Sequence, residues 1–348
     1  MKKILMATLF IGSTFLVAKA QNLSEIERLA REEGVINSVG MPDAWANWKG
    51  TWEQISQKYQ LKHVDTDMSS AQEIAKFANE KHNASADIGD VGISFGPIAV
   101  QRGVTQAYKP TTWEQVPDWA KDKDGHWVVA YTGTIAFMTN KNLVKDIPTS
   151  WADLLEGDYT VTIGDVLTGA QSINALLAAS FAYGGDENNI MPGIEFFKKL
   201  AAQNRLDLVD ASIANLEKEE VAVAILWDFN GLSYRDIIDR DRFEVSIPSD
   251  GSVMSGYSTI INRYAKHPNA AKLTREFIFS DQGQINLAQG YARPIRAQYL
   301  DFPKEVEARL LPESQYKNIY IIQDFNIWEK TTRKIPQLWQ EHIVSEMQ

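Results

Sequence analysis

The 348-residue sequence contains no cysteine, so neither a disulfide framework nor a lipid-modified cysteine is available to it. It has only five histidines, and they are scattered along the chain. Beyond the first 20 residues, no apolar run approaches the roughly 20 residues that a transmembrane helix needs. The sequence therefore predicts neither a disulfide-stapled scaffold nor a later membrane span.

Basic residues are also in short supply. The chain has 35 Lys and Arg against 45 Asp and Glu, a formal net charge of −10. So acidic a chain has no general attraction for nucleic acid or anionic lipid surfaces, and we expect neither as a partner.

The first 20 residues form a distinct segment. Residues 1–20 start with two lysines, continue in an apolar run and end in the small-residue sequence AKA. This pattern is typical of a secretory signal peptide cut before Gln21, and it is too short for a membrane span. Its removal takes away three lysines and lowers the charge to −13. We expect an exported, periplasmic protein of about 328 residues, enough for two domains.

The stretch 158–185 shows a strand followed by a helix. Tyr159–Ile163 alternates like a strand, and the apolar residues from Ile173 onwards recur at helical spacing. Between them, Thr168 and Gln171 fit a capping box. A helix N-terminus fed by a strand can bind an anionic group, although Thr168 could also serve only as a cap. The candidate binding residues here are Thr168, Gly169, Gln171 and Ser172.

The same plan occurs elsewhere in the chain. A predicted strand at 61–67 is followed by Ser69 and Ser70, which pair with Gln72 and Glu73 at capping-box spacing. The apolar run 221–226 is typical of a buried parallel strand, and it ends at the sequence WDFN. Ligands bind at the carboxyl ends of strands in open α/β sheets, so we expect binding side chains at these turns.

A third turn raises an enzymatic alternative. The sequence GISFG at 92–96, between a predicted strand and a helix, matches the nucleophile elbow of serine hydrolases, with Ser94 as nucleophile. However, no upstream oxyanion-hole segment is found. We therefore favour a binding protein over an enzyme, and keep an exported serine hydrolase as the competing class.

Two long β-rich segments suggest crossovers between domains. One is 126–140, interrupted at Tyr131-Thr132-Gly133, and the other is the pair 240–248 and 253–262. We interpret them as strands that pass from one lobe to the other, with hinges near Tyr131–Thr134 and Gly256–Thr259.

Five segments taken in order resemble the extracellular solute-binding proteins of ABC importers. They read EIERLAREEGVINSVG, DMSSAQEIAKFANEKHNASADIGDVG, YTGTIAFMTNKNLVKDIPTSWADLL, EEVAVAILWDFN and GYARPIR. The likeness is strongest to the branch that includes ferric-ion, phosphonate, sugar-phosphate, thiamine and polyamine binders. It implies a two-lobed α/β fold, the type II periplasmic binding protein fold, with two hinge strands and a ligand cleft between the lobes.

The resemblance also implies a division of the chain and a set of ligand contacts. We expect lobe 1 at 21–131 and 258–300, lobe 2 at 132–257, and C-terminal helices at 301–348 that pack across both lobes. The implied ligand contacts are Asp43, Trp45, Ser69, Ser70, Asp90, Ser94, Tyr131, Thr132, Thr168, Gly169, Gln171, Ser172, Trp227, Asp228, Asn230, Tyr257 and Arg293.

The sequence also predicts a class of ligand. Two capped helix starts, one from each lobe, favour a small polar solute with an anionic group, either phosphorylated, a phosphonate or a carboxylate, with zwitterions included in this class. A polyamine or other cationic amine is the alternative, because aromatic rings and aspartates could cage it. A ferric ion is disfavoured because the adjacent tyrosines of ferric binders are missing from WDFN. We expect a monomer with no cofactor and no bound metal, whose partner is an inner-membrane permease.

Overall fold

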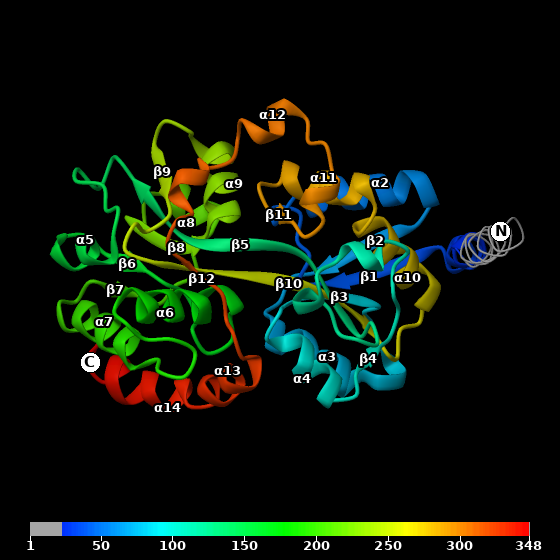
Figure 1. The fold of residues 1–348 in the computed structure, drawn as a ribbon, viewed down its shortest axis with the longest axis horizontal. Coiled ribbons are helices and arrows are strands. Elements are labelled where there is room, and N and C mark those ends of the chain that lie inside the picture. The colour runs from blue at the N-terminus through cyan, green and yellow to red at the C-terminus, as the bar shows by residue number, and fades with distance from the viewer. Residues whose placement is uncertain (1–22, 348) are drawn as a thin grey trace, which may run out of the picture.

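The computed structural model describes residues 23–347, which form two lobes lying side by side (Figure 1). Two long strands, β5 (Trp127–Asn140) and β10 (Ser252–Asn262), run from one lobe into the other. Nearly every residue of both strands is buried, because helices or loops cover both faces. The predicted two-lobed α/β fold with two connecting strands is confirmed. The predicted signal peptide, residues 1–20, lies outside the described residues.

The first lobe is built on parallel strands. In spatial order its sheet runs β2-β1-β3-β10-β5, with β1 parallel to both β2 and β3, and β10 antiparallel to β3. Residues 23–33 are helical. The other elements are β1 (Val35–Val39), α2 (Trp48–Tyr59), β2 (Lys62–Thr66), α3 (Ser70–Glu80), β3 (Ile88–Gly92), α4 (Phe95–Gln101), β4 (Thr105–Gln106), α10 (Pro268–Ile278), α11 (Asp281–Gln289) and β11 (Arg293–Pro294).

The second lobe continues the same sheet in the order β5-β8-β6-β7, with β9 also paired to β5. Its elements are α5 (Trp151–Glu156), β6 (Val161–Thr162), α6 (Ala170–Ala182), α7 (Met191–Ala202), β7 (Leu206–Asp207), α8 (Ile213–Glu217), β8 (Val223–Trp227), α9 (Asp228–Ile238) and β9 (Phe243–Ser246). The strand predicted at Tyr159–Ile163 is paired only at Val161 and Thr162.

The C-terminal segment touches both lobes. Its elements are α12 (Lys304–Glu307), β12 (Ile319–Tyr320), α13 (Phe325–Thr332), α14 (Ile335–Trp339) and a π-helical turn at Gln340–Val344. The short 3₁₀ turns of the chain are Lys81–Asn83, Trp113–Gln115, Asp118–Ala120, Ala297–Tyr299 and Glu313–Gln315. Strand β12 pairs with β10, and Arg309 donates a hydrogen bond to the Tyr291 hydroxyl. No helix within residues 23–347 is long and apolar enough to cross a bilayer.

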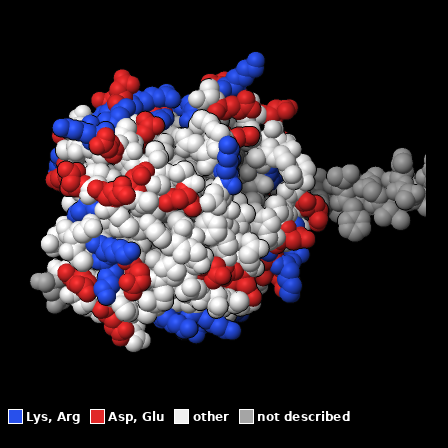
Figure 2. Space-filling model, turned by 60° about the vertical axis from the view of Figure 1, so that its left-hand side comes forward, with Lys and Arg blue, Asp and Glu red and all other residues white. Residues whose placement is uncertain are grey.

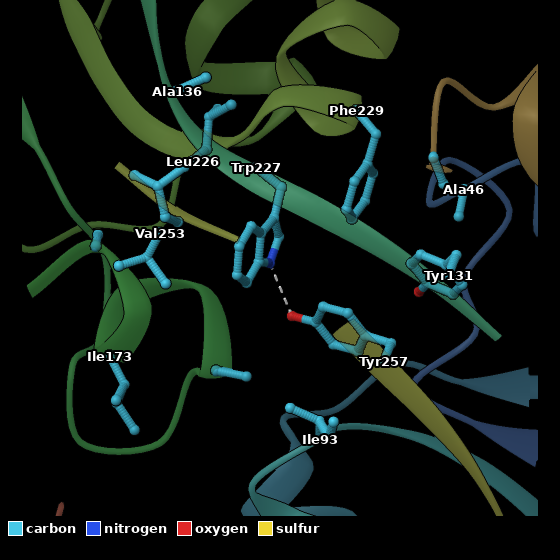
Figure 3. Packing of buried hydrophobic residues seen from close by; sticks show 14 of the residues in the cluster. Ala46, Ile93, Tyr131, Ala136, Ile173, Leu226, Trp227, Phe229, Val253 and Tyr257 are labelled. Carbon is cyan, nitrogen blue, oxygen red and sulfur yellow. Dashed lines mark hydrogen bonds between the residues drawn. The ribbon is translucent and has the colours of Figure 1, made fainter. Parts of the chain in front are cut away.

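The crossing point of β5 and β10 lies near the predicted hinges. The pairing of β5 changes from β10 at Thr134 to β8 at Ile135, and β10 has an irregular register between Tyr257 and Ser258. Figure 3 shows the aromatic cluster beside this point, where Trp227 Nε1 donates to the Tyr257 hydroxyl at 3.0 Å. The two lobes are thus connected through a packed aromatic contact as well as through backbone.

Candidate ligand-binding site

A cavity of about 710 Å³ lies between the lobes. The loop after β1 and the start of α3 line it from the first lobe, and the starts of α6 and α8 line it from the second. The structure brings nine of the predicted contact residues together around it, namely Trp45, Ser69, Ser70, Asp90, Thr168, Gly169, Gln171, Ser172 and Tyr257.

The start of α3 is held against the end of β3. Ser69 occupies the N-cap position, and the Gln72 side chain accepts a hydrogen bond from the Ser69 N–H at 2.9 Å. Ser70 Oγ accepts from the Gly92 N–H at 3.0 Å. The first N–H groups of a helix have no acceptor within the helix, so this tip presents donors to the cavity.

The start of α6 differs from the prediction. Gly169, not Thr168, is the N-cap, and Thr168 Oγ1 donates to Asp165 Oδ2 at 2.6 Å. Gln171 Oε1 accepts from the Trp227 N–H at 3.0 Å instead of closing a box. The predicted Thr168–Gln171 capping box is therefore wrong, because the Asp165 carboxylate is a stronger acceptor for the hydroxyl. The tip of α6 still faces the cavity through Gly169 and Gln171.

Two buried carboxyl groups, those of Glu73 and Asp90, also line the cavity, with exposed fractions of 1% and 2%. The Asp90 N–H donates to Glu73 Oε2 at 3.0 Å. Burial raises the pKa of Asp90 to about 8. Burial, and then the neighbouring Asp90 charge, raise the pKa of Glu73 well above its usual range. Both groups therefore hold protons more tightly than exposed carboxyls do.

A hydrogen-bonded aromatic chain supports Asp90 and one wall of the cavity. Trp45 Nε1 donates to the Tyr131 hydroxyl at 2.7 Å, and that hydroxyl donates to Asp90 Oδ2 at 2.6 Å. The Trp45 ring also meets the Tyr257 ring edge-on, with 5.4 Å between centroids. Trp45 lies in the loop before α2. Tyr131 is fully buried and acts behind the wall.

The charged side chains that line the cavity, among the described residues, are acidic. Among the described residues that line the cavity there is no Lys, Arg or His. The carboxyl groups around it are those of Asp67, Glu73, Asp90, Asp165 and Asp210, and Tyr234 and Ser212 complete the wall near α8. An anion bound here would have to be held by N–H groups and hydroxyls.

Glu73 was not predicted as a site residue, because its capping-box spacing indicated a local role at the start of the helix. Glu73 shares the buried face of α3 with Ile74 and Phe77. A carboxyl on an apolar helix face is the signal that could have identified it. Asp67, Asp165 and Asp210 line the cavity because of the conformations of their loops. A periodic sequence pattern does not predict the conformation of a loop.

The remaining predicted residues lie outside the cavity. Trp227 and Asn230 are buried behind Gln171, whose side chain accepts from the Asn230 amide at 3.0 Å. Asp228 instead binds the Thr134 N–H at 3.0 Å and the Tyr316 hydroxyl at 2.7 Å, and the Arg293 guanidinium lies 3.7 Å from the centroid of the Tyr316 ring. Those not lining the cavity are Asp43, Ser94, Tyr131, Thr132, Trp227, Asp228, Asn230 and Arg293.

Among residues 23–347, no histidine is hydrogen-bonded to Ser94. Ser94 occupies the N-cap position of α4, outside the cavity. His126 contacts Thr105 Oγ1 at 3.0 Å and His267 contacts Asp87 at 2.8 Å, so these two histidines are engaged elsewhere. Within residues 23–347, no group of three or more His, Asp or Glu side chains is placed to hold a metal ion.

Three comparisons place this geometry among known proteins. A family model described as bacterial extracellular solute-binding protein matches residues 83–321. The periplasmic binding protein AfuA from Actinobacillus pleuropneumoniae, solved with exogenous fructose-6-phosphate, superposes with a TM-score of 0.71 at 19% identity, covering 89% of this chain and 98% of that one. The ferric binding protein from Campylobacter jejuni superposes with a TM-score of 0.66 at 18% identity, covering 88% and 98%.

Sequence similarity to curated proteins is weaker. The sulfate-binding protein of Escherichia coli (strain K12) is 22% identical over 213 residues, which is 59% of this chain and 62% of the relative. The chain thus aligns with less than two thirds of that relative's length. At these identities the structural likeness shows the fold, and the family model shows the family.

Proposed function

The chain belongs to the family of bacterial extracellular solute-binding proteins, and from this premise we propose that it is the periplasmic substrate-binding component of an ABC transporter. It would capture a small polar solute with an anionic group and deliver it to a permease in the inner membrane. The family is one of binding proteins and not enzymes, in agreement with the surroundings of Ser94.

The proposal rests on one observation, namely that the N-termini of two helices line the same cavity. The N-terminal turns of α3 and α6, one from each lobe, line the same space. Each tip offers backbone N–H groups and the positive end of a helix dipole, and hydroxyls at Ser69, Ser70 and Ser172 stand beside them. This arrangement binds a phosphate, sulfate, phosphonate or carboxylate group without a basic side chain.

The relatives support this class of ligand in part. One is named for sulfate and another was solved with fructose-6-phosphate, whereas a third is named for ferric ion. The competing candidate is a cationic amine, favoured by the carboxyl-rich lining and by the aromatic wall of Trp45 and Tyr257.

We also propose the lobe limits, the location and the oligomeric state. Lobe 1 would comprise 21–131 and 258–300, lobe 2 would comprise 132–257, and 301–348 would pack across both as a monomer. The change of partner along β5 and the contacts of Arg309 and β12 are consistent with these limits. In the view of Figure 2, acidic and basic side chains are interspersed, and that face carries no continuous basic patch for nucleic acid.

The test is a binding panel that covers both classes of ligand. Phosphorylated sugars, phosphonates, sulfate, carboxylates, polyamines and ferric citrate are compared by thermal shift and then by calorimetry. At about 100 times the dissociation constant, the ligand should stabilise the protein by roughly 2.7 kcal/mol. Binding of polyamines alone would refute the anionic class.

A substitution at the tip of α6 tests the position of the site. Thr168→Trp fills the cavity beside Gly169, and we expect it to lower affinity for the bound anion at least 100-fold. The matched control is Asn79→Trp, on the exposed outer face of α3, which should leave affinity within threefold. Equal affinity of both variants would move the site away from this cavity.

A further inference from the structure

The side chain of Glu73 occupies a space in the cavity wall that exists because two neighbouring residues are glycines. A Cβ atom added at Gly40 would lie 2.3 Å from Glu73 Oε1, and one added at Gly89 would lie 2.4 Å from Glu73 Oε2. Gly40 directly follows β1 and Gly89 lies near the start of β3, so two neighbouring strands leave room for this one carboxyl group. Any larger residue at either position would displace it.

One oxygen of this carboxyl group is satisfied and the other is not. Oε2 accepts the Asp90 N–H at 3.0 Å, whereas Oε1 is buried and has no hydrogen-bond partner among residues 23–347. Leaving a buried acceptor unpaired destabilises a protein, and more so when the group is charged. The fold alone does not explain why a carboxyl group stands at a position that is 1% exposed.

The charged residues with the largest effect on the pKa of Glu73, among those that the structure describes, are acidic. Asp90 on β3, Asp65 on β2 and Asp67 after β2 all oppose its ionisation, and no basic residue lines the cavity within the described chain. An incoming cation would therefore find an unpaired acceptor, a second carboxyl at Asp90 and a negative potential. The aromatic side chains of Trp45 and Tyr257 line the same cavity.

We propose that Glu73 and Asp90 form a subsite for a protonated amino group, so that the solute is a zwitterion whose anionic group lies at the tips of α3 and α6. This inference rests on the proposed function, and it makes Glu73 the residue that selects an amine-bearing anion over an amine-free one. The acidic side chains of the cavity would then bind the amino group of the solute, and the N-terminal tips of α3 and α6 would bind its anionic group.

Binding of the ammonium group would be accompanied by the release of a proton from the cavity. Burial raises the pKa of Asp90 to about 8 and the pKa of Glu73 well above its usual range, so both carboxyls favour the protonated form when no cation is bound. An ammonium group favours the carboxylate form, so one carboxyl loses its proton to solvent as the ammonium binds. The amine keeps its charge, and the released proton is taken up by the buffer.

The experiment uses pairs of probes that share an anion and differ at the amine. They are glucosamine 6-phosphate with glucose 6-phosphate, 2-aminoethylphosphonate with ethylphosphonate, and taurine with ethanesulfonate. In the wild-type protein we expect the amine-bearing member of at least one pair to bind at least tenfold more tightly. In the Glu73→Gln variant that preference should fall below threefold.

The matched control is Glu80→Gln near the other end of the same helix, where Glu80 pairs with Lys76 outside the cavity. It should keep the amine preference. Equal or tighter binding of the amine-free member in every pair would overturn the amine subsite and leave the proposed function standing. Failure of all six probes to bind would refute the anionic function itself, and the amine subsite with it.

A measurement on the wild-type protein alone keeps the inference testable if Glu73→Gln does not fold. Calorimetry at pH 7 in two buffers of different ionisation enthalpy counts the protons released on binding. Release of up to about one proton with the amine-bearing probe, and none with its partner, is expected. Equal proton counts for both members would contradict the assignment.

Discussion

At the scale of the residue, Asp90 and Thr168 show two different reasons why a sequence does not predict the bonds of a side chain. Asp90 was expected as a ligand contact and does line the cavity, but its burial and its bond from Tyr131 could not be foreseen. Both depend on a partner 41 positions away in the chain. At Thr168 the capping-box pattern was present, yet Asp165, three residues earlier, took the hydroxyl. Local patterns identify candidate groups, and tertiary neighbours select among the bonds they can make.

The raised pKa of Asp90 predicts a pH-dependent stability of the empty protein. A group with a folded-state pKa near 8 and an ordinary unfolded value contributes stability that is fully present below pH 4 and is lost as pH rises towards 8. Asp90→Asn removes this contribution. Chemical denaturation between pH 4 and 8 should show wild-type stability falling relative to Asp90→Asn by several kcal/mol. A constant difference would contradict the buried, proton-holding state of Asp90.

The glycine at position 40 can be tested against a glycine with the same backbone conformation. Gly40 has φ +68° and Gly103 has φ +66°, so alanine is strained at both, by roughly 1–2 kcal/mol. Only at Gly40 would the new Cβ meet Glu73, since nothing lies within 4 Å at Gly103. Urea unfolding should show Gly40→Ala to be less stable than Gly103→Ala by about 1–3 kcal/mol. Solute affinity should fall only for Gly40→Ala, and similar losses in both would mean that Glu73 moves freely.

At the scale of the element, long periodic segments were predicted well and short ones poorly. The helix expected from the periodic apolar residues after Ile173 is present as α6, and the capping-box positions Ser69 and Ser70 do mark the start of a helix, α3. Strand β6 is reduced to two residues, since β7, its neighbour on one side, is equally short. Strand length depends on the partner, which the sequence of one strand does not contain.

The contact between α6 and β8 gives a prediction of its own. Gln171 Oε1 accepts from both the Trp227 N–H and the Asn230 amide, and so it anchors the tip of α6. In Gln171→Ala, the Trp227 N–H loses this acceptor, which should cost about 1–3 kcal/mol and weaken anion binding. Thermal unfolding and calorimetry measure the two effects. Gln101→Ala, at the exposed end of α4, serves as the control and should change neither.

At the scale of the whole molecule, the two-lobed plan followed from the ordered set of segments, but the approach of the lobes did not. A Cβ added at Gly92 in the first lobe would lie 2.6 Å from the Ala170 Cβ in the second. The two lobes therefore meet here through a glycine and an alanine, with no room for a further methyl group. Such a contact depends on the angle between the lobes, and no single segment of sequence encodes that angle.

This contact predicts that a methyl group added at position 92 would keep the lobes from closing, and that removal of the methyl group at position 170 would let them close again. Gly92→Ala should hold the lobes apart and lower solute affinity about tenfold, with little change in melting temperature. The double variant Gly92→Ala with Ala170→Gly restores the space and should recover affinity. Small-angle scattering with bound solute should show a larger radius of gyration for the single variant only. No recovery in the double variant would mean that the contact does not limit closure.

The two crossing strands have a further consequence for the order in which the chain can fold during synthesis. Strand β3 pairs along most of its length with β10, which ends at Asn262, so more than half of the chain must be made before the sheet of the first lobe is complete. Until then the buried edge of β3 lacks its neighbour and is open to non-native pairing. A polypeptide that stops before β10 should therefore be a target for chaperones, and the nascent first lobe should become protease-resistant only late in translation.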